Sequence, residues 1–189
     1  MIILFGAAGS GKSLQGQRLS ENHGWEWLSV GQLLRNRHDP ELEAIMLKGE
    51  LVPDDLVVRM MHDAAEEALA DGKPNVVLDG YPRDEWQANW IVENGDVEKI
   101  QGAIILRVSH DELWRRLQER GREDDTRESI EKRWNLFEQT IYSMSETLKT
   151  AGVQIVEVDG EGTVDEVTER IEKVLMDWSI INTQTEKIE

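Results

Sequence analysis

Eight residues near the beginning of the chain, Gly6 to Ser13, have the types and spacing needed to hold phosphate groups. The run reads Gly-Ala-Ala-Gly-Ser-Gly-Lys-Ser, the pattern G-x-x-x-x-G-K-[ST] of a phosphate-binding loop. Its glycines permit backbone angles closed to other residues, so that successive N–H groups can face one anion. Lys12 adds a cation for the terminal phosphates, and the Ser13 hydroxyl is suited to bind Mg²⁺. The pattern predicts a site for a nucleoside triphosphate.

The surroundings of this loop agree with that interpretation. The apolar run 1–5 comes directly before it, and the pattern of a helix begins near residue 12. A buried strand, a glycine turn and a helix form the context that such a loop requires, and the helix directs the positive end of its dipole at the phosphates. The alternative, a glycine turn that only joins a strand to a helix, leaves the lysine and the serine without a role.

A second candidate residue, Asp79, stands at the end of the apolar run 76–78. Ligands of open α/β sheets bind at the carboxyl ends of the strands, so Asp79 is expected to face the loop and to hold Mg²⁺ through water. The alternative is an aspartate that caps a turn or a helix. Pro82, after a Tyr81 that we expect to be exposed, fixes the turn and directs Arg83 into the cleft.

Short apolar runs alternate with amphipathic stretches along the chain, which predicts an α/β protein with a parallel sheet. The predicted strands span residues 2–5, 25–29, 76–79, 103–108 and 153–158. Predicted helices include 12–22, 54–71 and 127–150, and capping boxes are expected at Ser109 with Glu112 and at Thr163 with Glu166. The expected fold class is three-layer α/β/α with a five-stranded parallel sheet.

The composition limits the class of protein. A chain of 189 residues fits one domain, and 38 acidic against 21 basic residues give a formal net charge of −17. That charge repels nucleic acid and anionic membranes, so neither is expected as a partner. No apolar run approaches the length of a membrane span. The chain contains no cysteine, which excludes disulfides and cysteine chemistry and is compatible with the cytoplasm, where we expect the protein.

So acidic a chain also repels nucleotides unless its arginines gather at one place. Two segments interrupt the alternation of strands and helices, and they suggest the position of that place. Residues 31–75 have room for three helices, and residues 121–126 are short, charged and break two helices. Both are expected around the mouth of the phosphate site.

Five blocks, in order along the chain, resemble the adenylate kinase family of nucleoside monophosphate kinases from residue 1 to about residue 175. Together they are highly specific, although each one apart from the phosphate loop is weak. They are the loop itself, residues 29–35 (SVGQLLR), residues 49–53 (GELVP), residues 78–83 (LDGYPR) with Gln87, and residues 121–125 (GREDD) followed by Arg133.

This resemblance implies transfer of the γ-phosphoryl group of MgATP to a nucleoside monophosphate by a monomer, with Mg²⁺ as cofactor. It also implies a single domain over residues 1–177, with a monophosphate-binding segment at 30–53, a very short lid at 120–126 and a tail at 178–189. Residues matched to catalysis are Lys12, Arg83, Arg122 and Arg133. Residues matched to ATP binding are Gly9, Ser10, Gly11, Lys12, Ser13, Arg120 and Gly162. Residues matched to monophosphate binding are Val30, Gly31, Arg35, Glu50, Leu51, Val52, Gly80, Arg83, Gln87, Arg122 and Arg133.

By the same resemblance, Arg35 and Arg83 grip the acceptor phosphate, Gln87 reads the acceptor base, and Gly31 with residues 50–52 forms the pocket wall. Arg120 is matched to the arginine over the donor adenine and Gly162 to the loop near that base. Arg122 and Arg133 are matched to arginines that converge on the transferred group. For any one arginine, a surface ion pair is the alternative.

The chain departs from the family pattern at the acceptor base. Val30 stands where adenylate kinases carry threonine, and Gln32 where they carry aspartate. Val30 cannot hydrogen-bond a base, so a UMP/CMP kinase is an alternative to an AMP kinase, although Gln87 favours adenine. A nucleotide-binding module without turnover is a further alternative, against which the intact lysine and arginines argue.

The lid is the other departure. Only Gly121 separates Arg120 from Arg122, where the family has several residues. Because exclusion of water prevents idle hydrolysis of ATP, so short a lid predicts detectable ATP hydrolysis in the absence of an acceptor.

Overall fold

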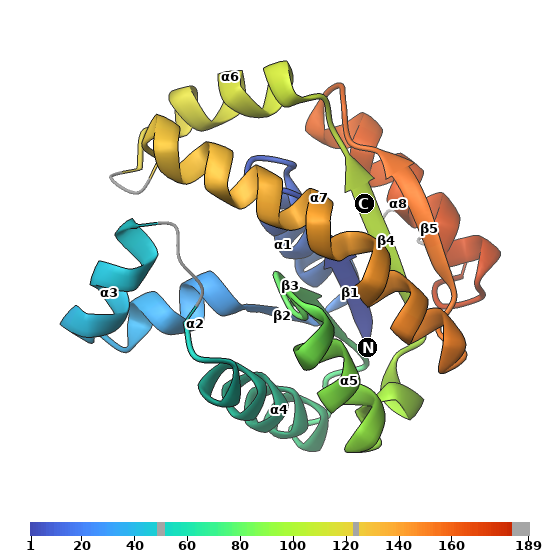
Figure 1. Ribbon diagram of the computed structural model, residues 1–189. Coiled ribbons are helices and arrows are strands. Elements are labelled where there is room, and N and C mark those ends of the chain that lie inside the picture. The colour runs from blue at the N-terminus through green and yellow to red at the C-terminus, as the bar shows by residue number, and fades with distance from the viewer. Residues whose placement is uncertain (49–51, 123–124, 183–189) are drawn as a thin grey trace.

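The computed structural model describes residues 1–48, 52–122 and 125–182, and its centre is a parallel sheet covered by helices on both faces (Figure 1). The five strands follow the order β2-β3-β1-β4-β5 across the sheet. They are β1 (Ile2–Phe5), β2 (Glu26–Ser29), β3 (Val76–Asp79), β4 (Gly102–Arg107) and β5 (Ile155–Asp159). The expected fold class, three layers around a five-stranded parallel sheet, is confirmed.

Helices connect these strands. They are α1 (Lys12–His23), α2 (Val30–Asn36), α3 (Pro40–Leu47), α4 (Asp54–Ala70), α5 (Glu85–Glu93), the 3₁₀ turn η1 (Asp96–Lys99), α6 (His110–Arg120), α7 (Arg127–Thr150) and α8 (Val164–Asp177). The prediction of three helices in the long connection after β2 is therefore confirmed by α2, α3 and α4.

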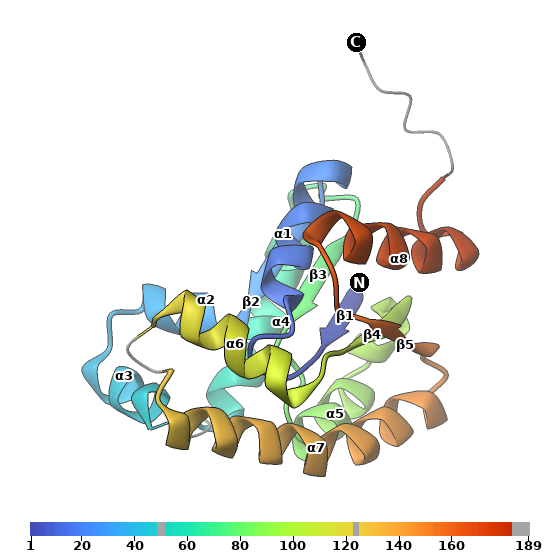
Figure 2. The same ribbon diagram turned by 90° about the horizontal axis from the view of Figure 1, so that it is seen from above.

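Alternating residues of β1 supply two separate cores, because successive side chains of a strand point to opposite faces. Ile3 and Phe5 join the cluster that α4, α5 and α7 cover, with Met144 of α7 among its most buried members. Ile2 and Leu4 join the cluster that α1 and α8 cover. Figure 2 shows α7 and α8 on opposite sides of the strands. The sheet edge that carries the strand ends is left for the site.

Three predictions need correction: the capping box at Ser109, the exposure of Tyr81 and the start of the tail 178–189. Thr163 and Glu166 form the expected capping box, but Ser109 and Glu112 do not. The backbone N–H of Ser109 donates to Glu161 Oε1 at 3.0 Å, and Glu112 binds Arg115 and Arg116. Tyr81, expected to be exposed, is 3% exposed and belongs to the core below α5.

The predicted tail 178–189 also begins as part of the core. Trp178, Ile180 and Ile181 pack against the cluster under α8, so the domain extends past residue 177. The rest of that segment, residues 183–189, lies outside the described residues. Among the helices of the described ranges, none combines the length and the apolar character needed to cross a membrane.

Candidate nucleotide site

The phosphate-binding loop lies between β1 and α1, as its sequence predicts. Gly9 and Gly11 adopt φ of 86° and 92°, left-handed angles that residues with a side chain disfavour. Gly11 is the N-cap of α1. The ammonium of Lys12 donates to the carbonyl of Ala7 across the loop, at 3.1 Å. The loop is therefore folded around its own lysine, with the start of α1 facing the same space.

Asp79 faces this loop because of the register of the sheet. β1 and β3 run parallel with Leu4 opposite Asp79, so the carboxylate at the end of β3 lies beside the strand that leads into the loop. The Ser13 hydroxyl donates to Asp79 Oδ2 at 2.6 Å. A hydroxyl and a carboxylate oxygen thus meet at the start of α1, which is the kind of hard oxygen ligand set that Mg²⁺ prefers.

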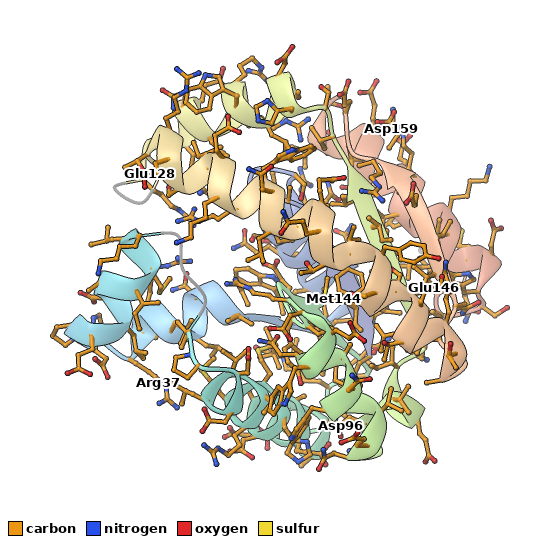
Figure 3. The ribbon with its side chains drawn as sticks, viewed as in Figure 1. Arg37, Asp96, Glu128, Met144, Glu146 and Asp159 are labelled. Carbon is orange, nitrogen blue, oxygen red and sulfur yellow. The ribbon has the colours of Figure 1, made fainter. Side chains whose placement is uncertain are left out.

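One cavity of about 190 Å³ brings most of the predicted site together. Of the residues that the structure describes, six cationic side chains and one carboxylate line it, although the chain as a whole is strongly acidic. These are Lys12, Arg35, Arg83, Arg120, Arg122, Arg133 and Asp79. Ser13, Gly31 and Gly80 also line this cavity, and its apolar wall includes Phe137 and Met144 on α7. Figure 3 shows where Met144 lies along α7.

Lys12 and Arg83 are half-buried in this cavity and lie among like charges. Burial lowers the pKa of Lys12; the Asp79 carboxylate raises it in part, and Arg83, Arg120 and Arg133 lower it again. Burial likewise lowers the pKa of Arg83, with Asp79 opposing and Arg133 and Arg35 adding to the effect. Like charges that are shielded from water repel one another. A polyanion that enters the site relieves this repulsion, so its binding is favourable.

Arg120 and Arg133, which lie outside the phosphate-binding loop, are both held by the carboxylate of Asp125. Arg120 donates from Nε to Asp125 Oδ2 at 2.8 Å, and Arg133 Nη1 lies 3.5 Å from Asp125 Oδ1. The Asp125 side chain is only 2% exposed. Sequence reasoning did not single out Asp125 by itself; its place in the acidic run 123–125 beside two candidate arginines was the available signal.

Arg133 also reaches the segment predicted to bind the acceptor. Its Nη2 donates to the carbonyl of Met46, near the end of α3, at 3.3 Å. Figures 1 and 2 both show α3 beside the ends of α6 and α7. The predicted monophosphate-binding segment and the predicted lid therefore meet at Arg133.

Several predicted residues lie behind the cavity instead of on its wall. Ser10, Val30, Val52 and Gln87 are all 4% exposed or less. The Oε1 of Gln87 accepts from the backbone N–H of Arg83 at 2.9 Å, which places the glutamine directly behind the wall. Gly162, with φ of 105°, lies in the turn before α8 and does not line this cavity. Glu50 and Leu51 lie outside the described residues.

A second cavity, of about 290 Å³, adjoins the first and shares Lys12, Ser13, Arg120 and Arg122 with it. Gly9, Gly11 and Arg116 lie on its wall. Arg116 Nη2 donates to the carbonyl of Gly160 at 3.1 Å, and Arg116 Nε binds Glu112. Sequence reasoning treated Arg116 as a candidate for a surface ion pair and missed this position, although Arg116 lies one helical turn before Arg120.

A phosphate loop, a carboxylate at the sheet edge and arginines converging from several segments define a phosphate-loop phosphotransferase with room for two ligands. Comparison with known proteins agrees. A model of the adenylate kinase family matches residues 4–153. Adenylate kinases of Prochlorococcus marinus (strain MIT 9211) and of Thermus thermophilus are each 34% identical to this chain. Each match covers 92% of the chain and 96% of the relative.

The adenylate kinase of Synechococcus sp. (strain WH7803) is 32% identical, over 92% of this chain and 97% of the relative. The chain belongs to the adenylate kinase family. It is therefore a nucleotide-binding enzyme that transfers phosphoryl groups between nucleotides.

Proposed function

We propose that the enzyme transfers the γ-phosphoryl group of MgATP to AMP and so forms two molecules of ADP. One observation carries the proposal: among the described residues, six cationic side chains and a single carboxylate line one cavity. A pair of nucleotides, with at least four phosphate groups between them, supplies the negative charge that this cavity lacks. The relatives named adenylate kinase support the same reaction.

The acceptor phosphate needs no general base, because its oxygen is already anionic at neutral pH. The protein's task is to hold the two phosphates in line and to neutralise the charge of the transferred group. Lys12 and Arg122, which line both cavities, and Arg133, on the wall of the first, fit this role. Ser13 and Asp79 would hold Mg²⁺, the latter through water, and the ion would supply further positive charge at the phosphates.

On the donor side, the contacts favour a change of assignment for one arginine. Arg120 acts on the pKa of Lys12 and binds Asp125, so we place it at the phosphates. Arg116 contacts the Gly160 carbonyl next to the loop that contains Gly162, so we place Arg116, in preference to Arg120, beside the donor base. The phosphate loop from Gly9 to Ser13 holds the donor phosphates.

On the acceptor side, Arg35 and Arg83 are assigned to the monophosphate, with Gly31 and Gly80 permitting its close approach. A Cβ at either glycine would lie 3.2–3.3 Å from a guanidinium nitrogen of its arginine. Residues 50–52 complete the wall, and Gln87 is assigned to the base. Val30 is fully buried and offers no hydrogen bond, which keeps a UMP/CMP kinase as the second candidate.

The test mixes MgATP with AMP, UMP, CMP or GMP and follows the formation of nucleoside diphosphate. We expect AMP to be the best acceptor, loss of turnover in Lys12→Ala and Arg83→Ala, and normal turnover in Lys149→Ala, whose side chain is half exposed. Binding of ATP without turnover of any acceptor would show a nucleotide-binding module instead. A cytoplasmic monomer remains our prediction, and the mass in solution tests the monomer.

A further inference from the structure

Gln87 is the one residue assigned to the acceptor base that could tell one base from another, and its side chain is held at both ends. It is 1% exposed. Its Oε1 accepts from the backbone N–H of Arg83 at 2.9 Å, and its Nε2 donates to Asp54 Oδ1 at 2.6 Å. A backbone N–H can only donate and a carboxylate can only accept, so both partners independently require the same orientation of the amide.

Asp54 occupies a particular place in the chain. It is the first residue of α4, directly after the predicted monophosphate-binding segment 30–53, whereas Gln87 lies on α5. Their hydrogen bond joins the end of that segment to the loop that carries Arg83. An acidic residue in the first turn of α4 is favourable for the helix, but Asp55 already supplies one.

The surroundings of Asp54 show that stability alone does not account for it. A second carboxyl, Asp84, binds the backbone N–H of Gln87 at 2.8 Å. Burial raises the pKa of Asp84; the hydrogen bond from Gln87 lowers it in part, and the neighbouring Asp54 raises it. Asp84 caps α5 through that backbone N–H, whereas Asp54 repels Asp84 and yet contacts the amide side chain of Gln87 itself, which points to a role for Asp54 in holding this side chain.

An amide held in this way offers a fixed order of hydrogen-bonding groups. With one N–H given to Asp54 and one lone pair of Oε1 taken by Arg83, one N–H and one lone pair remain, side by side. One orientation of the amide pairs with an exocyclic amine, which donates, next to an unprotonated ring nitrogen, which accepts, as in adenine and cytosine. A keto group next to a ring N–H, as in uracil, guanine and hypoxanthine, needs the reverse order, which a free glutamine provides by turning its amide over.

We propose that Asp54 determines acceptor specificity by preventing this turn, so that the site accepts amino bases and rejects keto bases. This inference rests on the proposed function, since it assumes that Gln87 meets the base of a nucleoside monophosphate. Asp54 acts through Gln87 and is a positioning residue. It narrows the acceptor to a chemical class, nucleoside monophosphates whose base carries an exocyclic amine in place of the keto group, next to an unprotonated ring nitrogen. The choice between adenine and cytosine is left to the size of the pocket.

The sharpest probe is a pair of acceptors that differ only at this edge, AMP and inosine monophosphate. With saturating MgATP, we expect the wild-type kcat/KM for AMP to exceed that for inosine monophosphate by at least about 100-fold, because a site built for a hydrogen bond rejects an analogue that leaves it unpaired. In Asp54→Asn, whose side chain can meet either end of the amide, this ratio should fall at least about tenfold, with the KM for ATP unchanged.

Asp55→Asn is the matched control, because Asp55 is exposed and pairs with Arg59, away from Gln87. Its AMP-to-inosine monophosphate ratio should equal the wild-type ratio. An unchanged ratio in Asp54→Asn, or an equal loss of activity toward both acceptors, would overturn the inference and leave Asp54 a structural residue. If Asp54→Asn does not fold, the wild-type ratio decides alone, and equal use of both acceptors overturns the inference.

The two proposals fail in different ways. If the wild-type enzyme phosphorylates none of the four standard acceptors, the proposed function itself fails. If it phosphorylates AMP and accepts inosine monophosphate equally well, only the role of Asp54 fails. Preference for UMP over both AMP and CMP would also overturn the inference, because uracil presents the order that Asp54 is proposed to exclude.

Discussion

The phosphate loop and the connection between α6 and α7 both carry cations to the same cavity, but they hold them in opposite ways. Lys12 is half-buried among other cations, with Asp79 as the carboxylate that opposes them. Arg120 and Arg133 share the buried carboxylate of Asp125. The loop therefore retains unbalanced charge for an incoming polyanion, whereas the connection anchors two arginines on one shared carboxylate.

Replacing the lysine breaks the first half of this comparison and should have the largest effect. We expect Lys12→Met to lower kcat by at least about 10²–10³-fold, because it removes a positioned charge from the group being transferred. Coupled measurement of ADP formation checks this, with Lys149→Met as the control. Retention of more than about a tenth of the wild-type kcat would show that the arginines suffice.

Replacing Asp125 tests the second half of this comparison, the two arginines that share one carboxylate. Asp125→Asn leaves two arginines without their shared charge, and we expect the free energy of unfolding to fall by about 2 kcal/mol. We expect kcat to fall about tenfold, because Arg120 and Arg133 lose their common anchor. Urea denaturation and steady-state kinetics measure the two effects, and Asp63→Asn, an exposed change on α4, is the control. Full activity in Asp125→Asn would show that the nucleotides alone position both arginines.

The dependence of stability on pH sharpens the contrast. Burial lowers the folded-state pKa of Lys12, so below that pKa the folded state holds a proton at a cost. The free energy of unfolding should then rise as the pH increases from the folded pKa toward about 10.4, the usual value for lysine, because the unfolded chain binds more protons in that window.

The difference between wild type and Lys12→Met isolates this contribution. Denaturation of the nucleotide-free proteins across the alkaline range should give a steeper rise for the wild type, and Lys12→Met should be at least as stable at neutral pH. Identical slopes in the two proteins would contradict the unbalanced charge at Lys12.

The smallest expected effect concerns water. Residues 121–126 alone join α6 to α7, and we expect a connection so short to cover little of the site. We expect MgATP to be hydrolysed without an acceptor at more than about one per cent of the kinase rate. Lys12→Met should abolish this release of phosphate if it occurs at the site. A rate below that level would mean that α3, held to Arg133 through Met46, closes the site sufficiently.

The sequence predicted the parts of the site that are local in the chain. The phosphate loop, the aspartate at the end of β3 and the helix α7 each follow from a pattern within one element, and the strands were placed to within a residue or two. The loop glycines and Asp79 needed only the direction of a parallel sheet to be brought together.

Contacts between distant segments were beyond such patterns. Asp125 accepts from arginines on two helices, and Asp54 reaches Gln87 across a long connection. Glu112 matched a capping box with Ser109, but it binds two arginines on its own helix, and Glu161, from the loop after β5, accepts from the Ser109 N–H instead. In each case the sequence identifies the polar groups, and only the fold decides which partner wins.

The packing of Trp178 has a consequence for how this chain can evolve. A methyl group at Gly102, the first residue of β4, would lie 2.3 Å from Trp178 Cζ3. Alanine can therefore enter position 102 only after the indole has been replaced by something smaller, whereas a smaller side chain at 178 leaves a void but no clash. The two positions permit one order of substitution and resist the other, so lineages that keep this tryptophan should also keep the glycine.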